Sequence, residues 1–121
     1  MTTMQETVIR NQKSNVKLNA MDLTARIREA VRKLEPDADI ILYGSRSRGD
    51  ADPDSDWDVL ILVDAPVNEE RTDRIRYSLY EIEWESGQVI SSIVRTRDEW
   101  ESDRYKAMPF HQRVQREGIR L

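Results

Sequence analysis

The chain has 121 residues, of which 35% are charged and none is cysteine, and its formal net charge at pH 7 is -4. This length has room for one domain with a modest core, and the lack of cysteine excludes disulfides and thiolate metal sites. No apolar run reaches the length of a membrane span, and the first residues contain no apolar segment of the secretory type, so we expect a cytoplasmic protein.

Residues 1–19 are polar, and we interpret them as a flexible extension of a single domain that spans residues 20–121. The first predicted helix begins with Asp22 as its N-cap and ends at residues 35–36, since the residue before a proline avoids the helical conformation. Its apolar residues recur at the spacing of one helical face: Leu23, Ile27, Ala30, Val31 and Leu34. We therefore expect this helix to pack on a sheet.

A strand is predicted over residues 39–43, which are too apolar on both faces for an exposed edge. It leads into Gly44 and Ser45, where glycine tolerates positive φ. The unpaired amides of a short helical turn over residues 45–48 can bind an anion. The pattern predicts a phosphate cradle, in which Ser45 offers its hydroxyl and amide and Gly49 ends the turn.

The other side chains of this turn have separate interpretations. Arg48 could contact phosphate or pair with an aspartate of the loop, and the sequence leaves both open. Arg46 and Ser47 are expected to face solvent.

Two aspartates open the second predicted strand, which covers about residues 57–64. Ten residues separate Ser45 from Asp56, and Asp58 follows after one more. Alternate residues of a strand share a face, so both carboxylates project together while Trp57 points into the core rather than toward a stacked base. Two carboxylates suit Mg²⁺, and an acidic loop would repel a triphosphate unless a cation were bound.

A Gly-Ser pair followed by ten residues and Asp-x-Asp resembles the signature of the DNA polymerase β-like nucleotidyltransferase superfamily. The short chain is similar to the minimal nucleotidyltransferases of that superfamily. The matching residues are Gly44, Ser45, Arg48, Gly49, Ser55, Asp56 and Asp58. An acidic surface turn between strands is the alternative interpretation, because Asp, Pro and Gly are ordinary turn residues.

The resemblance has implications for fold and site. It implies an α/β (α+β) fold in which helices pack on a small mixed sheet. It gives Asp56 and Asp58 the catalytic and Mg²⁺-binding roles. It assigns nucleotide binding to the rest of the motif: Gly44, Ser45, Arg48, Gly49 and Ser55.

A second long helix is predicted from the N-cap Asn68 to Gly87, with a buried stripe of Ile75, Leu79 and Ile82. Tyr80 and Trp84 lie one turn apart on it, and we interpret them as the margin of the core, with an interface as the alternative. Glu81 and Glu85 are expected in solvent.

The third predicted strand, residues 89–94, departs from the family pattern. The resemblance implies a third carboxylate on such a strand, yet no Asp or Glu lies between Gln88 and Arg97, and Ser91 or Ser92 stands in its place. A neutral hydroxyl is a poor base and a weak metal ligand. The sequence therefore supports nucleotide binding more strongly than it supports turnover.

The remaining residues predict a short helical start at 97–101 and a helix from Pro109 to Gly118. Aromatic and aliphatic side chains of this segment are expected to cover one edge of the sheet: Trp100, Tyr105, Phe110 and Val114. His111 is the single histidine, so we interpret it as structural rather than as a zinc ligand.

Three functions are compatible with these features. The first is a Mg²⁺-dependent transferase that moves a nucleoside monophosphate, with ATP as the expected donor, to a hydroxyl of a partner protein. Minimal nucleotidyltransferases resemble the antitoxin half of modules whose other half is a helical HEPN protein, so the resemblance implies a HEPN-type partner. The second is a nucleotide-binding or partner-binding antitoxin without turnover. The third, a nucleic-acid-modifying transferase, is disfavoured because no basic stripe interleaved with aromatics is present. A homo-oligomer is left open.

Overall fold

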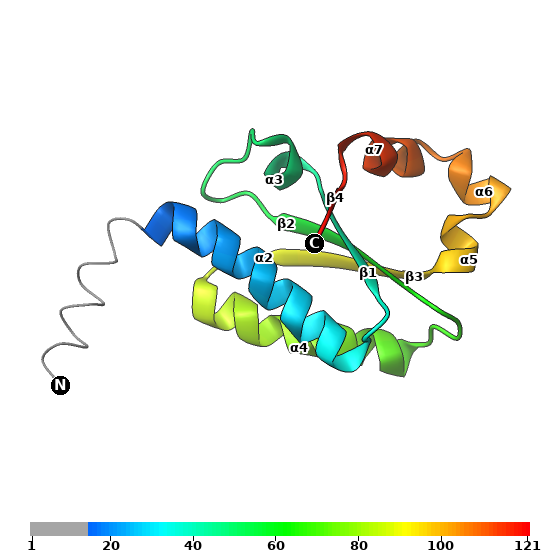
Figure 1. The fold of residues 1–121 in the computed structure, drawn as a ribbon, viewed down its shortest axis with the longest axis horizontal. Coiled ribbons are helices and arrows are strands. Elements are labelled where there is room, and N and C mark those ends of the chain that lie inside the picture. The colour runs from blue at the N-terminus through cyan, green and yellow to red at the C-terminus, as the bar shows by residue number, and fades with distance from the viewer. Residues whose placement is uncertain (1–14) are drawn as a thin grey trace, which may run out of the picture.

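The computed structural model describes residues 15–121, with side chains described from Leu23 onward. A four-stranded sheet lies between two layers of helices (Figure 1). The helices are α2 (Asn15–Leu34), α3 (Ser45–Arg48), α4 (Glu69–Ser86), α5 (Arg97–Trp100), α6 (Asp103–Lys106) and α7 (Pro109–Glu117). The strands are β1 (Asp39–Tyr43), β2 (Trp57–Val63), β3 (Ile90–Thr96) and β4 (Ile119–Arg120).

The strand order is β3-β2-β1-β4, and the sheet is mixed as the sequence predicts. β1 and β2 are antiparallel neighbours, β2 and β3 are parallel, and β4 pairs antiparallel with β1. The parallel pair needs a crossover, which α4 provides. The apolar β1 and β2 therefore lie inside the sheet, where both of their faces are covered.

Helices α2 and α4 cover one face of the sheet, which we call the α2/α4 face (Figure 1). Its core is mainly aliphatic and includes Ile27 of α2, Ile61 of β2 and Ile75 of α4, all with 0% exposure. Trp57 is buried in the same cluster, which confirms its predicted core position. The salt bridge between Arg26 and Glu85 joins the two helices at their surface.

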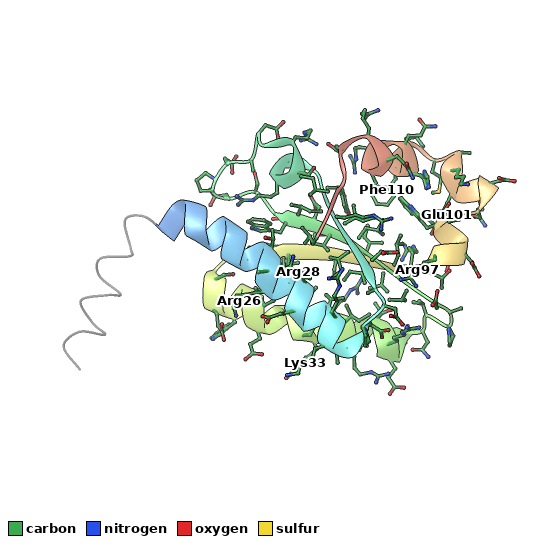
Figure 2. All side chains as sticks on the ribbon, viewed as in Figure 1. Arg26, Arg28, Lys33, Arg97, Glu101 and Phe110 are labelled. Atoms are coloured by element: carbon green, nitrogen blue, oxygen red, sulfur yellow. The ribbon has the colours of Figure 1, made fainter. Side chains whose placement is uncertain are left out.

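The segment α5–α7 covers the opposite face, which we call the α7 face. Trp100, Tyr105, Phe110 and Val114 pack there against Tyr43 and Leu60 of the sheet. Figure 2 shows Phe110 in this layer. The sequence predicted that these residues cover an edge. They cover a face because Leu60 alternates in β2 with the residues that point toward α2 and α4.

His111 lies within this layer and is 5% exposed. Its ring stacks on Trp100 with centroids 4.2 Å apart, and its Nε2 accepts and donates no hydrogen bond among the described residues. This packing agrees with the predicted structural role.

Several predicted boundaries differ from the structure. α2 contains Asp22 and begins at Asn15, so Asp22 is not an N-cap, and residues 15–19 of the predicted extension are helical. The rest of that extension, residues 1–14, lies outside the described residues. β3 extends to Thr96, and β4 was not predicted at all. Among residues 15–121, no helix has the length and apolar content needed to cross a membrane.

Candidate active site

The loop between β1 and β2 brings the predicted site residues to one end of the sheet. Because the two strands are antiparallel, the end of β1 meets the beginning of β2, and Tyr43 pairs with Asp58. Gly44 and Ser45 follow directly on one strand, and Asp56 precedes the other. A hairpin is thus sufficient to place the Gly-Ser pair beside the Asp-x-Asp pair.

Two features of the structure require glycine at position 44. Its φ is +79°, a conformation that L side chains rarely adopt. A Cβ atom at this position would also lie 2.5 Å from Oδ2 of Asp58, well inside van der Waals contact. The carboxylate of Asp58 therefore packs directly against the backbone of Gly44.

Helix α3 begins immediately after this glycine. The amides of Ser47 and Arg48 each donate to the Gly44 carbonyl at 3.1 Å, and the Ser47 hydroxyl donates to the same oxygen at 2.8 Å. The first amides of a helix have no acceptor within it, so those of Ser45 and Arg46 remain as candidate anion donors. Gly49 closes the turn with a φ of +82°, as its predicted role requires.

Asp56 and Asp58 differ in their surroundings. Asp56 is exposed and Asp58 is half-buried, and neither side chain accepts a hydrogen bond from the part of the chain that the structure describes. Burial raises the pKa of Asp58, and the negative charge of Asp56 raises it further. Arg113 and Arg48 lower it and oppose this effect only in part. The pair therefore concentrates negative charge that the protein leaves incompletely neutralised.

Arg48 lies at the end of α3 and is held by two carboxylates. Its Nε donates to Asp50 at 3.1 Å and its Nη1 donates to Glu117 at 2.8 Å. Both bonds raise its pKa, that of Glu117 more. A guanidinium has five N–H donors, so three remain for a ligand. The structure thus shows the predicted pairing with a loop aspartate and keeps donors for a phosphate as well.

The chain matches the family model of the nucleotidyltransferase domain over residues 24–116. The chain belongs to the nucleotidyltransferase domain family. The match and the mixed sheet confirm the polymerase β-like fold, and they establish a transferase domain at the level of the family. A comparison with curated proteins found no match.

Within this nucleotidyltransferase fold, Ser91 is the residue that faces the aspartate pair from β3. It pairs with Asp58 in the parallel register, and paired residues of neighbouring strands share a face. Ser92 pairs with Val59 and lies on the α2/α4 face. Of the two serines that the sequence offered for the position of a third carboxylate, the register therefore selects Ser91.

Glu117 is a residue of this region that sequence reasoning missed. It is the last residue of α7, its side chain is 9% exposed, and it forms the 2.8 Å bridge to Arg48. Its Oε1 lies 3.5 Å from Nε of Arg113 and accepts no hydrogen bond from the described residues. No local sequence pattern identifies it, because the approach of this helix end to β1 appears only in the folded chain, where a Cβ at Gly118 would lie 2.7 Å from Ile41.

Contacts of Arg46 and Ser55 stabilise the acidic loop of the nucleotidyltransferase domain, residues 46–58. The guanidinium of Arg46 lies 4.6 Å from the centroid of Trp57 and donates to the carbonyl of Ser55 at 3.0 Å. Ser55 also accepts at Oγ from the amide of Asp52 at 3.0 Å. The prediction that Arg46 faces solvent is wrong, because stacking on the indole holds it against the loop. The contacts of Ser55 support the loop, and its role in nucleotide binding stays a prediction.

Asp56 and Asp58 fit Mg²⁺ by their chemistry. Mg²⁺ is usually held by one or two carboxylates together with substrate phosphates and water, so a pair is sufficient. Among residues 23–121, no three acidic or histidine side chains group closely enough to hold an ion by themselves. The unpaired charge around Asp58 is the observation that favours a cation here. A metal at this pair would share its coordination with a bound triphosphate.

Proposed function

We propose that the chain is a Mg²⁺-dependent nucleotidyltransferase that moves AMP from ATP to a hydroxyl group of a partner protein. The observation that carries the proposal is the contact between Asp58 and Gly44, which joins a carboxylate pair to a turn with free amides. This juxtaposition is suited to a metal-bound triphosphate and to few other ligands.

The residues have distinct roles in this proposal. Asp56 and Asp58 would hold Mg²⁺, which when bound would neutralise the phosphates and polarise the α-phosphate. The amides of Ser45 and Arg46 would bind the β- and γ-phosphates at the start of α3. The free donors of Arg48 would bind a phosphate oxygen from the other side of the turn. Catalysis of this kind depends mainly on positioning and charge neutralisation.

The transfer itself exchanges one P–O bond for another. The acceptor oxygen forms a bond to the α-phosphorus, and the bond from that phosphorus to the bridging oxygen of the β-phosphate breaks. Pyrophosphate leaves with the electron pair, and the hydroxyl proton passes to solvent or to a carboxylate. The partner protein is inferred from the resemblance to minimal nucleotidyltransferases, some of which add AMP to a helical HEPN-type partner.

Ser91 favours a second candidate, a nucleotide-binding antitoxin without turnover. It stands opposite Asp58 where the family pattern has an acid, and its hydroxyl is a poor base. In this case the chain would bind ATP and its partner and transfer nothing.

Incubation with α-labelled ATP and Mg²⁺, with and without the product of the adjacent gene, tests both candidates. We expect a labelled adduct on the partner with the wild-type chain and none with Asp56→Asn. Binding of ATP without an adduct would support the second candidate. If calorimetry detected no binding of MgATP that depends on Asp56, both would be rejected.

A further inference from the structure

The solvent-facing side of α4 carries aromatic and acidic side chains that the proposed function does not use. Its members recur at helical spacing on one side of the helix and are all exposed: Glu70, Asp73, Tyr77, Tyr80, Glu81 and Trp84. We call this set the α4 stripe. It lies on the outer side of α4, whereas Asp58 shares by alternation the side of β2 on which Leu60 and Leu62 pack, the α7 face.

The aromatic members of the stripe are unusually accessible. Tyr77 is 76% exposed, Tyr80 58% and Trp84 90%. The interpretation of Tyr80 and Trp84 as the margin of the core is therefore wrong, because both rings point away from it. The rings of Tyr77 and Tyr80 lie edge to face with centroids 6.3 Å apart, and exposed aromatic rings that gather on one side of a helix are typical of an interaction site. The structure favours the alternative interpretation, an interface.

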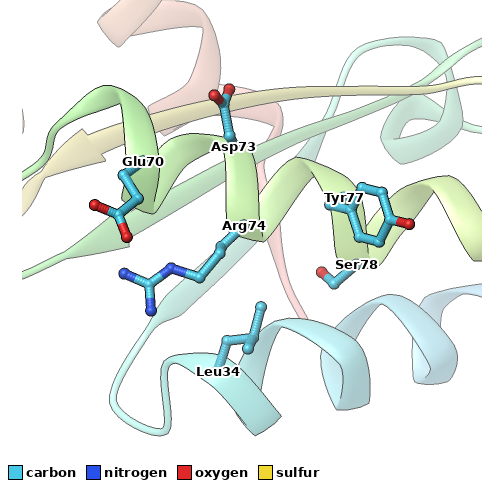
Figure 3. A pocket seen from close by; sticks show the side chains of 6 residues that line it. All are labelled: Leu34, Glu70, Asp73, Arg74, Tyr77 and Ser78. Atoms are coloured by element: carbon cyan, nitrogen blue, oxygen red, sulfur yellow. The ribbon is translucent and has the colours of Figure 1, made fainter.

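A pocket of about 480 Å³ opens beside one end of the stripe. Leu34 points from the end of α2 toward α4, and Arg74 and Tyr77 lie on either side of it (Figure 3). Leu34 is 43% exposed although it lies at the end of the buried face of α2. The pocket can therefore receive one large apolar side chain from a partner.

The charges of the stripe favour a basic partner, because its three acids outnumber the two exposed arginines that flank it on α4, Arg74 and Arg76. Glu70, Asp73 and Glu81 make no ion pair with any of residues 23–121. Lysine and arginine side chains would pair with these carboxylates and could also stack over the faces of the neighbouring rings. The stripe is thus complementary to a surface that combines basic and apolar residues.

Two other occupants fit less well. A second copy of the chain joined by a two-fold axis would bring the acidic stripe against itself, and like charges in contact oppose association. A nucleic acid could stack its bases on the aromatic rings, but the three carboxylates would repel its phosphates.

We propose that the α4 stripe is the docking site for a basic amphipathic helix of a partner protein. The aromatic rings lie along the length of α4, so a helix packed beside it can reach them with residues from successive turns. An apolar anchor of that helix enters the pocket at Leu34 and Tyr77, and its lysine or arginine residues bind the three acids. This surface is separate from the candidate active site and does not depend on the proposed transfer reaction.

Tryptophan fluorescence of the full chain tests the proposal directly. Trp57 is 5% exposed and Trp100 3%, so a change in emission on binding would come chiefly from Trp84. The probes are two synthetic helical peptides with the same leucine stripe, one with lysine and arginine on its polar face and one with glutamate. We expect the basic peptide to shift the emission to shorter wavelength at micromolar concentration, with weakening by salt, and the acidic peptide to have no effect.

Variants identify the surface that is responsible. Tyr77→Ser should lower the affinity for the basic peptide by about tenfold or more, since aromatic anchors dominate such interfaces. The triple variant Glu70→Lys, Asp73→Lys, Glu81→Lys should no longer bind the basic peptide and should bind the acidic one. Glu101→Lys, an exposed acid on another part of the chain, is the matched control and should bind as the wild type does.

Four results would overturn the proposal. They are the absence of a shift with the basic peptide, equal binding of both peptides, tighter binding of a polynucleotide, and a dimer in sedimentation that Trp84→Ser dissociates. The last would assign the stripe to a second copy of the chain. All variants should bind MgATP as the wild type does. Loss of peptide binding with intact nucleotide binding therefore separates this proposal from the proposed function.

Discussion

The α2/α4 face of the sheet is closed by aliphatic side chains, whereas the α7 face combines aromatic rings with carboxylates and arginines. On the first face, Ile27, Ile61 and Ile75 have no exposed surface. On the second, Asp58 is half-buried without a hydrogen-bond partner among the described residues, and one carboxylate oxygen of Glu117 accepts no hydrogen bond from them although it lies 3.5 Å from Arg113. The comparison indicates that one face supplies most of the stability and the other maintains a charged site that costs stability.

The largest expected effect is on the α2/α4 face. Ile61→Ala should lower the free energy of unfolding by about 2–5 kcal/mol, because it removes a fully buried side chain and leaves a cavity. Urea denaturation followed by circular dichroism measures this loss. Val89→Ala, at a position 53% exposed, is the control and should change little. A cost below about 1 kcal/mol for Ile61→Ala would contradict the assignment of stability to this face.

Asp58→Asn should lower the transfer activity of the α7 face and raise its stability, which separates these two properties. We expect nucleotidyl transfer to fall by about 100-fold or more, since a charge that positions the reacting phosphates is lost. The free energy of unfolding should rise at neutral pH without metal and nucleotide. The folded chain raises the pKa of Asp58, so the ionised carboxylate destabilises the fold above its ordinary pKa, and asparagine removes that cost.

Thermal unfolding from acid to neutral pH, in parallel with transfer assays, measures both effects. The stability gain from Asp58→Asn should be small in acid and grow as pH rises through the pKa of the wild-type carboxyl. Asp54→Asn, in the exposed loop, is the control. A destabilised Asp58→Asn chain at neutral pH would show that the α7 face does not carry this cost.

Glu117→Gln should have a smaller effect, confined to the ligand. Glutamine keeps the volume of the side chain but removes the charge that orients Arg48. We expect the affinity for MgATP to fall by about 3- to 10-fold, which corresponds to the net contribution of one typical hydrogen bond, with little change in unfolding temperature. Calorimetry in the wild-type and Arg48→Met backgrounds measures the coupling. An equal loss of affinity in both backgrounds would exclude a role through Arg48.

The smallest expected effect concerns Glu35, which joins the end of α2 to α4 through Arg71. The guanidinium donates to both carboxylate oxygens, at 2.9 and 2.5 Å, and the hydrogen bond lowers the pKa of Glu35. Its contribution is therefore present above the ordinary pKa and is lost as pH falls through the lowered value. Glu35→Gln should cost about 1 kcal/mol at neutral pH and nothing in strong acid, by urea denaturation at each pH. A cost independent of pH would contradict the ion pair.

Local patterns in the sequence predicted most of the fold. Continuous apolar runs on either side of the Gly-Ser to Asp-x-Asp loop identified β1 and β2, and the Asn68 cap and Gly87 marked α4. The face covered by α5–α7 could not be predicted, because it depends on pairing between distant segments. β4 has only two residues, and its partner lies far away in the sequence, so no periodic pattern predicts it.

The candidate site divides in the same way. The Gly-Ser and Asp-x-Asp elements are local, and the structure brings them together as expected. The bridge from Arg48 to Glu117 spans 69 residues and was not predicted, since an isolated glutamate at a helix end has no distinctive pattern. The choice of Ser91 over Ser92 needed the register between β2 and β3.

The hairpin that carries the Gly-Ser and Asp-x-Asp elements has a consequence for the kinetics of folding. Its two strands are joined by a single loop, so their pairing closes only a short segment of chain and can occur early. The parallel pairing of β2 with β3 must wait for α4, and docking of α7 must wait longer still. Pulsed hydrogen exchange should therefore protect the amides of β1 and β2 before those of the C-terminal helix.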